Sequence, residues 1–205
     1  MKKIKDIIQE KSKIRRQANI FEAQEAAENK ERWLVVKVEN YIERFSLDIS
    51  VEDILVKIKK DYLYAATLAK DPGRQNIAEK VQLEEIGKYC EVQQLPTKGK
   101  DALYINNGEI SKIKSRTKSI DAIINDTYCS LKYTKDGGGS QDNQRDDIYN
   151  TLDASKDCTE NFAAIVDGEY WDKELPKLVA EYKNYQNIWI GTSDDWIKEK
   201  GTRAV

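Results

Sequence analysis

Histidine is absent from this chain of 205 residues, and its absence excludes several kinds of active site. Ser-His-Asp and Cys-His nucleophile systems, histidine-containing deaminase sites and histidine-ligated zinc all require an imidazole. Any hydrolytic chemistry must therefore use carboxylates, lysine and a hard metal ion.

Cysteine and long apolar runs are also scarce. The three cysteines, Cys90, Cys129 and Cys158, are widely spaced and form no Cys-x-x-Cys pair. This pattern argues against a disulfide framework and against a zinc site. No apolar run approaches the roughly 18 residues of a membrane span, and residues 1–5 lead into an amphipathic pattern instead of a secretory signal. We therefore expect a cytoplasmic protein with no membrane partner.

A strong net charge is lacking as well, because 34 Lys and Arg residues almost cancel 36 Asp and Glu residues. General attraction to a polyanion is therefore weak, and a nucleic-acid surface would have to be local.

The first part of the chain, residues 1–71, has the spacing of amphipathic helices. Ser50 and Asp53 predict an N-terminal cap for a helical segment that runs to Leu68. The Asp71-Pro72-Gly73 sequence then interrupts the pattern. We expect a helical N-terminal region that serves as a DNA-binding or dimerisation arm, and a second region over residues 72–205.

Short β-type runs alternate with helical patterns in the second region, after a helix predicted from Gln75 to Cys90. This order predicts an α/β fold with a central mixed sheet flanked by helices. The predicted strands are 102–105, 110–113, 119–124, 127–134, 162–166 and 187–190, and the predicted helices are 141–152 and 173–185.

Asn125-Asp126 is a favourable two-residue hairpin turn, and it sets the register of the strands on either side. Ala122 then pairs with Cys129, and Asp121 lies opposite Ser130. Side chains alternate along a strand, so Asp121, Tyr128, Ser130 and Lys132 share one face. The other face is predicted to be apolar and carries Ile120, Ala122, Ile124, Cys129, Leu131 and Tyr133.

An aspartate beside a lysine suits phosphodiester hydrolysis. The carboxylate can hold Mg²⁺ through oxygen, and the lysine can stabilise the attacking hydroxide or the phosphate charge. An exposed Asp-Lys cross-strand pair with no function is the structural alternative.

The segment after the hairpin combines glycines, cations and amides. Glycines allow backbone N–H groups to approach a phosphate, and Asn and Gln recognise adenine edges. A polar loop without function is the alternative. The residues expected to approach DNA from this segment are Lys135, Gln141, Asn143, Gln144 and Arg145.

The hairpin, the helix after it and the strand-helix-strand that follows resemble the core of the PD-(D/E)xK nucleases, particularly type II restriction endonucleases. The resemblance covers about residues 72–196. It implies a restriction-endonuclease-like core in which Asp121 is the first metal-binding acid, Lys132 is the catalytic lysine and the Leu131 carbonyl is a further Mg²⁺ ligand.

The sequence departs from the family pattern at two positions. Ile120 replaces the proline, which does no chemistry, and Ser130 replaces the second acid. Some related enzymes have a Ser-x-Lys sequence and take the missing carboxylate from the following helix, where Asp142 and Asp146 are the candidates here.

The resemblance also implies a glutamate from the helix before the sheet, and it points to Glu79. The helical wheel instead favours Glu85, which lies near the centre of the apolar face. Both residues stay open as metal ligands.

Four cations, Lys112, Lys114, Arg116 and Lys118, alternate along an expected extended segment. They form either a phosphate-contacting stripe or the solvated side of an edge strand.

We therefore expect a Mg²⁺-dependent endonuclease that cuts double-stranded DNA at specific sites. We expect it to act as a homodimer, with a cognate DNA methyltransferase as a partner in the same system. The alternatives are a non-specific repair nuclease, a DNA-binding module without activity on the same fold, and a protein-protein module built on the helical N-terminus.

Overall fold

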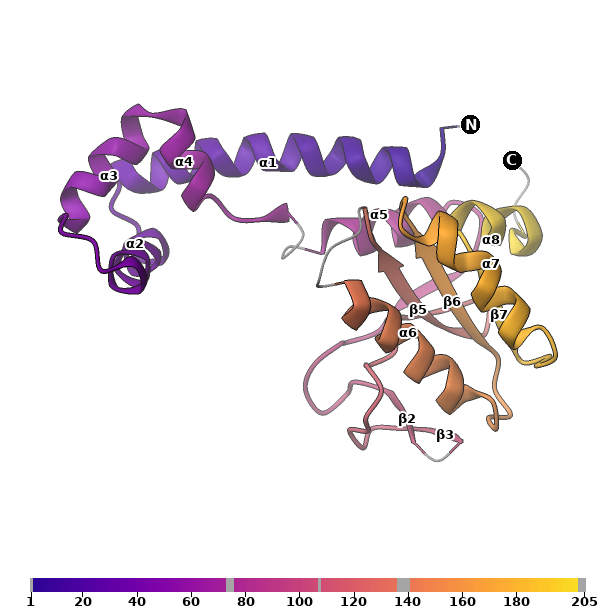
Figure 1. The fold of residues 1–205 in the computed structure, drawn as a ribbon. Coiled ribbons are helices and arrows are strands. Elements are labelled where there is room, and N and C mark those ends of the chain that lie inside the picture. Colours follow the sequence, from indigo (N-terminus) through magenta and orange to yellow (C-terminus); the bar gives the residue numbers. More distant parts are fainter. Residues whose placement is uncertain (1, 73–75, 107, 136–140, 203–205) are drawn as a thin grey trace. The chain divides into compact units, whose positions relative to one another are not determined.

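The computed structural model describes residues 2–72, 76–106, 108–135 and 141–202, except for the side chains of Gln141 and Asp142. It divides into two compact units (Figure 1). One unit is Ile8–Ile77, and the other combines Met1–Ile7 with Ala78–Val205. The sequence predicts the division between residues 71 and 72. In the structure it falls six residues later, between Ile77 and Ala78.

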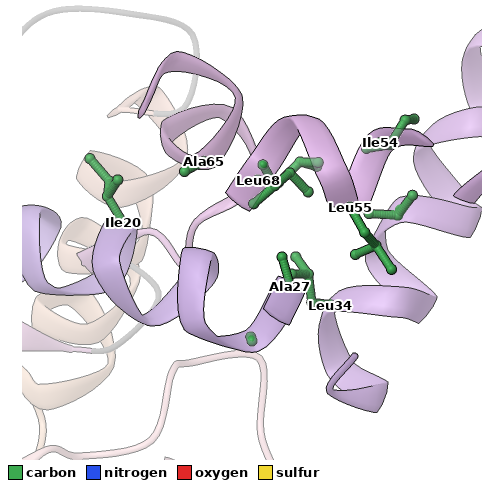
Figure 2. Close-up of a cluster of buried hydrophobic side chains, with 10 residues drawn as sticks. Ile20, Ala27, Leu34, Ile54, Leu55, Ala65 and Leu68 are labelled. Carbon is green, nitrogen blue, oxygen red and sulfur yellow. The ribbon is translucent and has the colours of Figure 1, made fainter. Parts of the chain in front are cut away.

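The helical unit, Ile8–Ile77, contains most of the first helix and three shorter ones. These helices are α1 (Ile4–Glu28), α2 (Arg32–Phe45), α3 (Val51–Lys60) and α4 (Tyr62–Leu68). Their apolar faces meet in a core that includes Leu34, Ile54 and Leu68 (Figure 2). The helical unit thus has a hydrophobic core of its own.

The ends of the short helices follow from local side-chain chemistry. The Ser50 hydroxyl accepts a hydrogen bond from the N–H of Asp53, which confirms the predicted cap. The predicted segment to Leu68 is not one helix, because Asp61 adopts an extended conformation between α3 and α4. Its carboxylate accepts a hydrogen bond from the N–H of Leu63 and so begins α4 as a new helix.

The sheet unit, Met1–Ile7 with Ala78–Val205, has a five-stranded mixed sheet in the order β1-β4-β5-β6-β7. The strands β1, β4 and β5 are antiparallel neighbours, whereas β5, β6 and β7 are parallel. These strands are β1 (Val92–Gln94), β4 (Ala122–Ile124), β5 (Thr127–Tyr133), β6 (Phe162–Asp167) and β7 (Ile188–Gly191). The predicted α/β class with a central mixed sheet is therefore confirmed.

Helices cover both faces of the sheet (Figure 1). Ile148 of α6 and Leu178 of α7 belong to one core cluster with Val166 of β6. Asp167, the next residue of β6, faces the opposite side and is bound by residues of α5 and α8. The helices are α5 (Ile77–Ile86), α6 (Gln141–Ser155), α7 (Trp171–Tyr182) and α8 (Ser193–Lys200).

Two elements were not predicted from the sequence. The strand β1 has only three residues, Val92–Gln94, and none of them is buried, so it lacks a hydrophobic signal. The helix α8 begins with a capping box between Thr192 and Asp195. A separate hairpin of β2 (Tyr104–Asn106) and β3 (Glu109–Ser111) is close to its predicted position, although residue 107 of its turn lies outside the described residues. No helix in the described part of the chain is both long and apolar enough to cross a membrane.

Gly168 allows the end of β6 to approach the end of β5. Its φ is +112°, and an added Cβ would overlap the backbone carbonyl oxygen of Thr134. We expect Gly168→Ala to destabilise the protein by roughly 3 kcal/mol or more, because strain and overlap act together.

Gly99→Ala is the matched control, since Gly99 also has a positive φ of +87° but open space within 4 Å of its Cβ position. It should cost about 1 kcal/mol, from the backbone alone. Urea unfolding measures both variants, and equal losses would contradict the steric explanation.

Candidate functional site

The β4–β5 hairpin has the predicted register. Asn125 and Asp126 both have positive φ, 47° and 63°, as a tight hairpin turn requires. Ala122 pairs with Cys129 and Ile124 with Thr127, as predicted. Ser130 and Lys132 share one face of β5. Asp121 lies one residue before β4, and its N–H donates a hydrogen bond to the Cys129 carbonyl at 3.0 Å, so the regular pairing of the strands does not extend to it.

Ile120 does not lie on the predicted apolar face, so this prediction was wrong. It belongs to the core cluster of Tyr128 and Phe162, which lie on the other side of the hairpin from Cys129. Ile120 precedes β4, so the strict alternation of a strand does not extend to it.

The Asp121 carboxylate is buried, with 6% of the residue exposed. Its Oδ2 accepts a hydrogen bond from the N–H of Leu131 at 2.8 Å. Burial raises the pKa of Asp121 from its ordinary 3.8 to about 6, while Lys132 and the Leu131 N–H act to lower it and Glu79 acts to raise it. This carboxyl group is therefore held in a costly ionised form at neutral pH.

Lys132 acts on Asp121 through the charge of its ammonium group, as the largest influence that lowers the pKa of the carboxyl. Its side chain is half-buried near the end of β5, and its backbone carbonyl accepts a hydrogen bond from Gln82 at 3.4 Å. The lysine thus provides a positive charge close to a buried carboxylate.

Glu79 is an acid whose charge acts on Asp121. It lies in the first turn of α5, and its Oε1 accepts a hydrogen bond from Gln94 at 3.3 Å. Gln94 pairs with Ala122, directly beside Asp121, which explains why the Glu79 charge raises the pKa of Asp121. Glu85, the rival from the helical wheel, instead forms an ion pair with Lys88.

The Leu131 carbonyl is directed to the same strand edge as Asp121. The N–H and C=O of one residue in a strand point to the same side, and the Leu131 N–H donates to Asp121. Leu131 therefore has the orientation that its predicted role as a backbone ligand needs.

The two acids expected from the following helix, Asp142 and Asp146, give little support to a metal site. Asp146 is exposed, and its Oδ1 is 3.4 Å from an Arg145 nitrogen in an ion pair. The side chain of Asp142 lies outside the described residues. Across the described side chains, no group of three or more His, Cys, Asp and Glu residues is placed to hold a metal ion. Ser130, where the family pattern has its second acid, is buried with 6% exposure.

The residues predicted to contact DNA have different positions. Gln144 is half-buried, and its Oε1 accepts a hydrogen bond from the Thr134 hydroxyl at 2.6 Å, so it has a structural contact. Asn143 and Lys135 are exposed. The side chain of Gln141 and the residues 136–140 of the glycine loop are not described.

The cation stripe is not an extended strand, because β3 ends at Ser111. Lys114 and Arg116 are exposed, which fits both a phosphate-contacting and a merely solvated role. The two outer cations have carboxylate partners, since Lys112 pairs with Asp101 at 2.9 Å and Lys118 with Asp147 at 3.3 Å.

A buried polar network of Asp167, Gln82 and Ser193 lies beside the site and was not predicted from the sequence. Asp167 precedes a glycine, a pair typical of a turn, but it is the last residue of β6 and is 2% exposed. Its carboxylate accepts hydrogen bonds from Gln82 at 2.7 Å and from the Ser193 hydroxyl. Burial raises the pKa of Asp167, and these donors act to lower it. The available signal was a polar residue, Gln82, within an otherwise apolar helical stripe.

Comparison with protein-family models, with curated proteins and with solved structures gives no match to this chain.

The raised pKa of Asp121 predicts a pH-dependent cost of folding. Between pH 3.8 and about 6 the unfolded chain ionises first, so this group lowers the stability of the folded protein as the pH rises. Asp121→Asn should therefore be more stable than the wild type above pH 7, by on the order of 3 kcal/mol, and close to it near pH 4.

Urea unfolding at several pH values in the presence of EDTA measures this difference. The asparagine carbonyl can still accept the hydrogen bond from Leu131, so the comparison isolates the charge. A stability difference that does not change with pH contradicts the cost assigned to the buried carboxylate.

Proposed function

We propose that this protein is a Mg²⁺-dependent endonuclease that hydrolyses phosphodiester bonds of double-stranded DNA. The observation that carries the proposal is the Asp121 carboxylate, buried at a strand edge and influenced by both Lys132 and Glu79. A buried acid with a raised pKa beside a cation is more typical of a reaction site than of a surface pair.

The order of elements in the sheet unit supports the restriction-endonuclease-like form of the fold. A helix, α5, precedes an antiparallel hairpin, and a helix, a parallel strand, a further helix and a further parallel strand follow it. These are the elements on which the resemblance to the PD-(D/E)xK nucleases rests. Asp121 and Lys132 occupy the positions of the first acid and the lysine in that pattern.

The donor groups are suitable for magnesium. Asp121, Glu79 and the Leu131 carbonyl offer only oxygen, which is the ligand type of hard divalent cations. When bound, Mg²⁺ would polarise the phosphate and lower the pKa of a bound water. The residues of the chain would bind the ion, and Lys132 would orient the attacking oxygen and stabilise negative charge on the phosphate.

Cations and amides near the hairpin support DNA as the substrate. Lys114, Arg116 and Lys135 are exposed and suited to phosphate contacts. Asn143, exposed in the first turn of α6, has an amide that can recognise a base edge. We therefore propose site-specific cleavage, as in type II restriction enzymes.

A second candidate is a DNA-binding module that has lost hydrolysis. Ser130 in place of the second acid favours it, and so does the lack of a three-acid group among the described side chains. A site with few oxygen ligands would hold Mg²⁺ weakly.

Incubation of the protein with phage DNA and MgCl₂ tests the proposal. Discrete bands are expected, whereas a smear indicates a non-specific nuclease and retarded but intact DNA indicates the binding module. Asp121→Asn and Lys132→Ala should each lower the cleavage rate by at least about 100-fold, because the first weakens the hold on Mg²⁺ and the second removes the positive charge that stabilises the phosphate.

Glu79→Gln should also lose activity. Two single variants, Glu85→Gln and Lys88→Ala, are the matched controls and should each cut like the wild type. Cleavage at the wild-type rate by Lys132→Ala, with the fold confirmed by circular dichroism, refutes this site. Loss of activity in Glu85→Gln but not in Glu79→Gln would assign the second acid to Glu85 instead.

A further inference from the structure

A cavity with a volume of about 540 Å³ lies in the sheet unit, where β5, β6 and β7 begin. Its lining includes the first residue of each of these strands, Thr127, Phe162 and Ile188, together with the carboxyl end of α8. The acids and the lysine of the candidate nuclease site lie outside this lining. A cavity of this size is typical of sites for small molecules.

Two of the amide side chains in the lining are bonded to the fold. Asn187 precedes β7, and its Nδ2 donates hydrogen bonds to the carbonyls of Ser155 and Cys158 at 2.8 and 3.0 Å. Asn125, in the hairpin turn, donates from Nδ2 to the Lys200 carbonyl at the end of α8, at 2.9 Å. Hydrogen bonds between distant segments therefore fix the walls of the cavity before any ligand arrives.

Two further amides in the lining, Asn161 and Gln186, are exposed. Neither side chain makes a hydrogen bond within the described part of the chain. Asn161 directly precedes β6 and Gln186 lies two residues before β7, and these strands are parallel neighbours. Both amides are consequently at the same end of the sheet, where each offers a donor beside an acceptor.

Two tryptophans form the aromatic part of the lining. The rings of Trp189 and Trp196 meet edge to face, with centroids 4.9 Å apart and an angle of 87°. Gly191 makes room for Trp189, because an added Cβ would lie 2.5 Å from its Cη2. The Trp189 Nε1 donates to the Glu199 carboxylate at 2.9 Å, so the indole is held in place. A fixed, half-buried indole is suited to stacking on a planar heterocycle.

The indole N–H of Trp196 is a buried donor without an acceptor among the described residues. Trp196 is 1% exposed, and it lines the cavity. A buried donor that makes no hydrogen bond costs free energy. An acceptor on a ligand that reaches this N–H would remove the cost.

The charges of the cavity disfavour phosphate. Glu199 and Lys200 are the charged residues of its lining, and their charges offset each other. Both belong to the last turn of α8, where the helix dipole is negative. A neutral ligand therefore suits the cavity better than an anion.

We propose that this cavity binds a neutral adenine nucleoside. The base stacks on Trp189, and the amides of Asn161 and Gln186 bond its two edges on which a donor lies beside an acceptor. Another ring nitrogen of the base accepts the hydrogen bond from Trp196. The proposal involves no residue of the nuclease site and is independent of the nuclease activity.

Nuclear magnetic resonance of the ¹⁵N-labelled full-length protein, titrated with adenosine, tests the proposal. The chain has four indole N–H groups, those of Trp33, Trp171, Trp189 and Trp196. Adenosine should shift the signals of Trp189 and Trp196 saturably and leave the other two unchanged. AMP should bind about tenfold or more weakly, because its phosphate meets the negative end of α8. Glucose should shift none of the four signals.

Substitution of the exposed amides tests their role. Asn161→Ala and Gln186→Ala should each weaken adenosine binding by about tenfold, because each removes hydrogen bonds to the base. Asn184→Ala is the matched control, since Asn184 is an exposed amide two residues before Gln186 but does not line the cavity. It should bind adenosine like the wild type, and circular dichroism checks that each variant is folded.

The absence of a saturable shift with adenosine overturns the proposal, and so does an equal shift of all four indole signals. Shifts with glucose in place of adenosine would make the cavity a sugar site and refute the nucleoside. An equal loss of binding in Asn184→Ala and Gln186→Ala contradicts the role of the amides. A protein that cuts DNA without binding adenosine refutes this site alone, whereas one that binds adenosine without cutting DNA supports it and refutes the nuclease.

Discussion

The register of the β4–β5 hairpin is the constraint on which the candidate site depends. Asn125 and Asp126 hold positive φ values that join the two strands with a two-residue turn. A slip of one residue would move every side chain to the opposite face of the sheet. Asp121 would then lose the hydrogen bond from the Leu131 N–H, and the parallel addition of β6 to β5 would bury different residues.

In an isolated hairpin Asp121 would be exposed to water. The rest of the sheet unit buries its carboxylate and thereby changes its pKa. The Leu131 N–H fixes one carboxylate oxygen, while β1 and α5 add Gln94 and Glu79 beside it. Burial and a neighbouring acid both oppose ionisation, which raises the pKa of Asp121. A fold selected only for stability would not keep such a group, so the cost itself favours a functional interpretation.

Hydrophobic patterning made most of the fold predictable, because the helices carry apolar stripes and the central strand β6 is a short run of mostly apolar residues that is buried throughout. The three-residue strand β1 was not predictable, since it carries no apolar pattern of its own and is defined by its pairing with β4. The buried position of Asp167 was not predictable either, because it also depends on residues distant in the chain. A carboxylate before a glycine is typical of a turn, and only the donors from Gln82 and Ser193 allow it to be buried.

The sequence by itself limited the chemistry that is possible, since a chain without histidine cannot form the Ser-His-Asp, Cys-His or histidine-ligated zinc sites used in hydrolysis. It also determined the pairing of Ala122 with Cys129 and the shared face of Ser130 and Lys132, because a turn and an alternating strand are local features. Only the tertiary structure decided between Glu79 and Glu85 as the acid near Asp121, and it separated Asp146 from a metal-binding group in the described residues. These choices depend on contacts between segments distant in the chain, which no local pattern encodes.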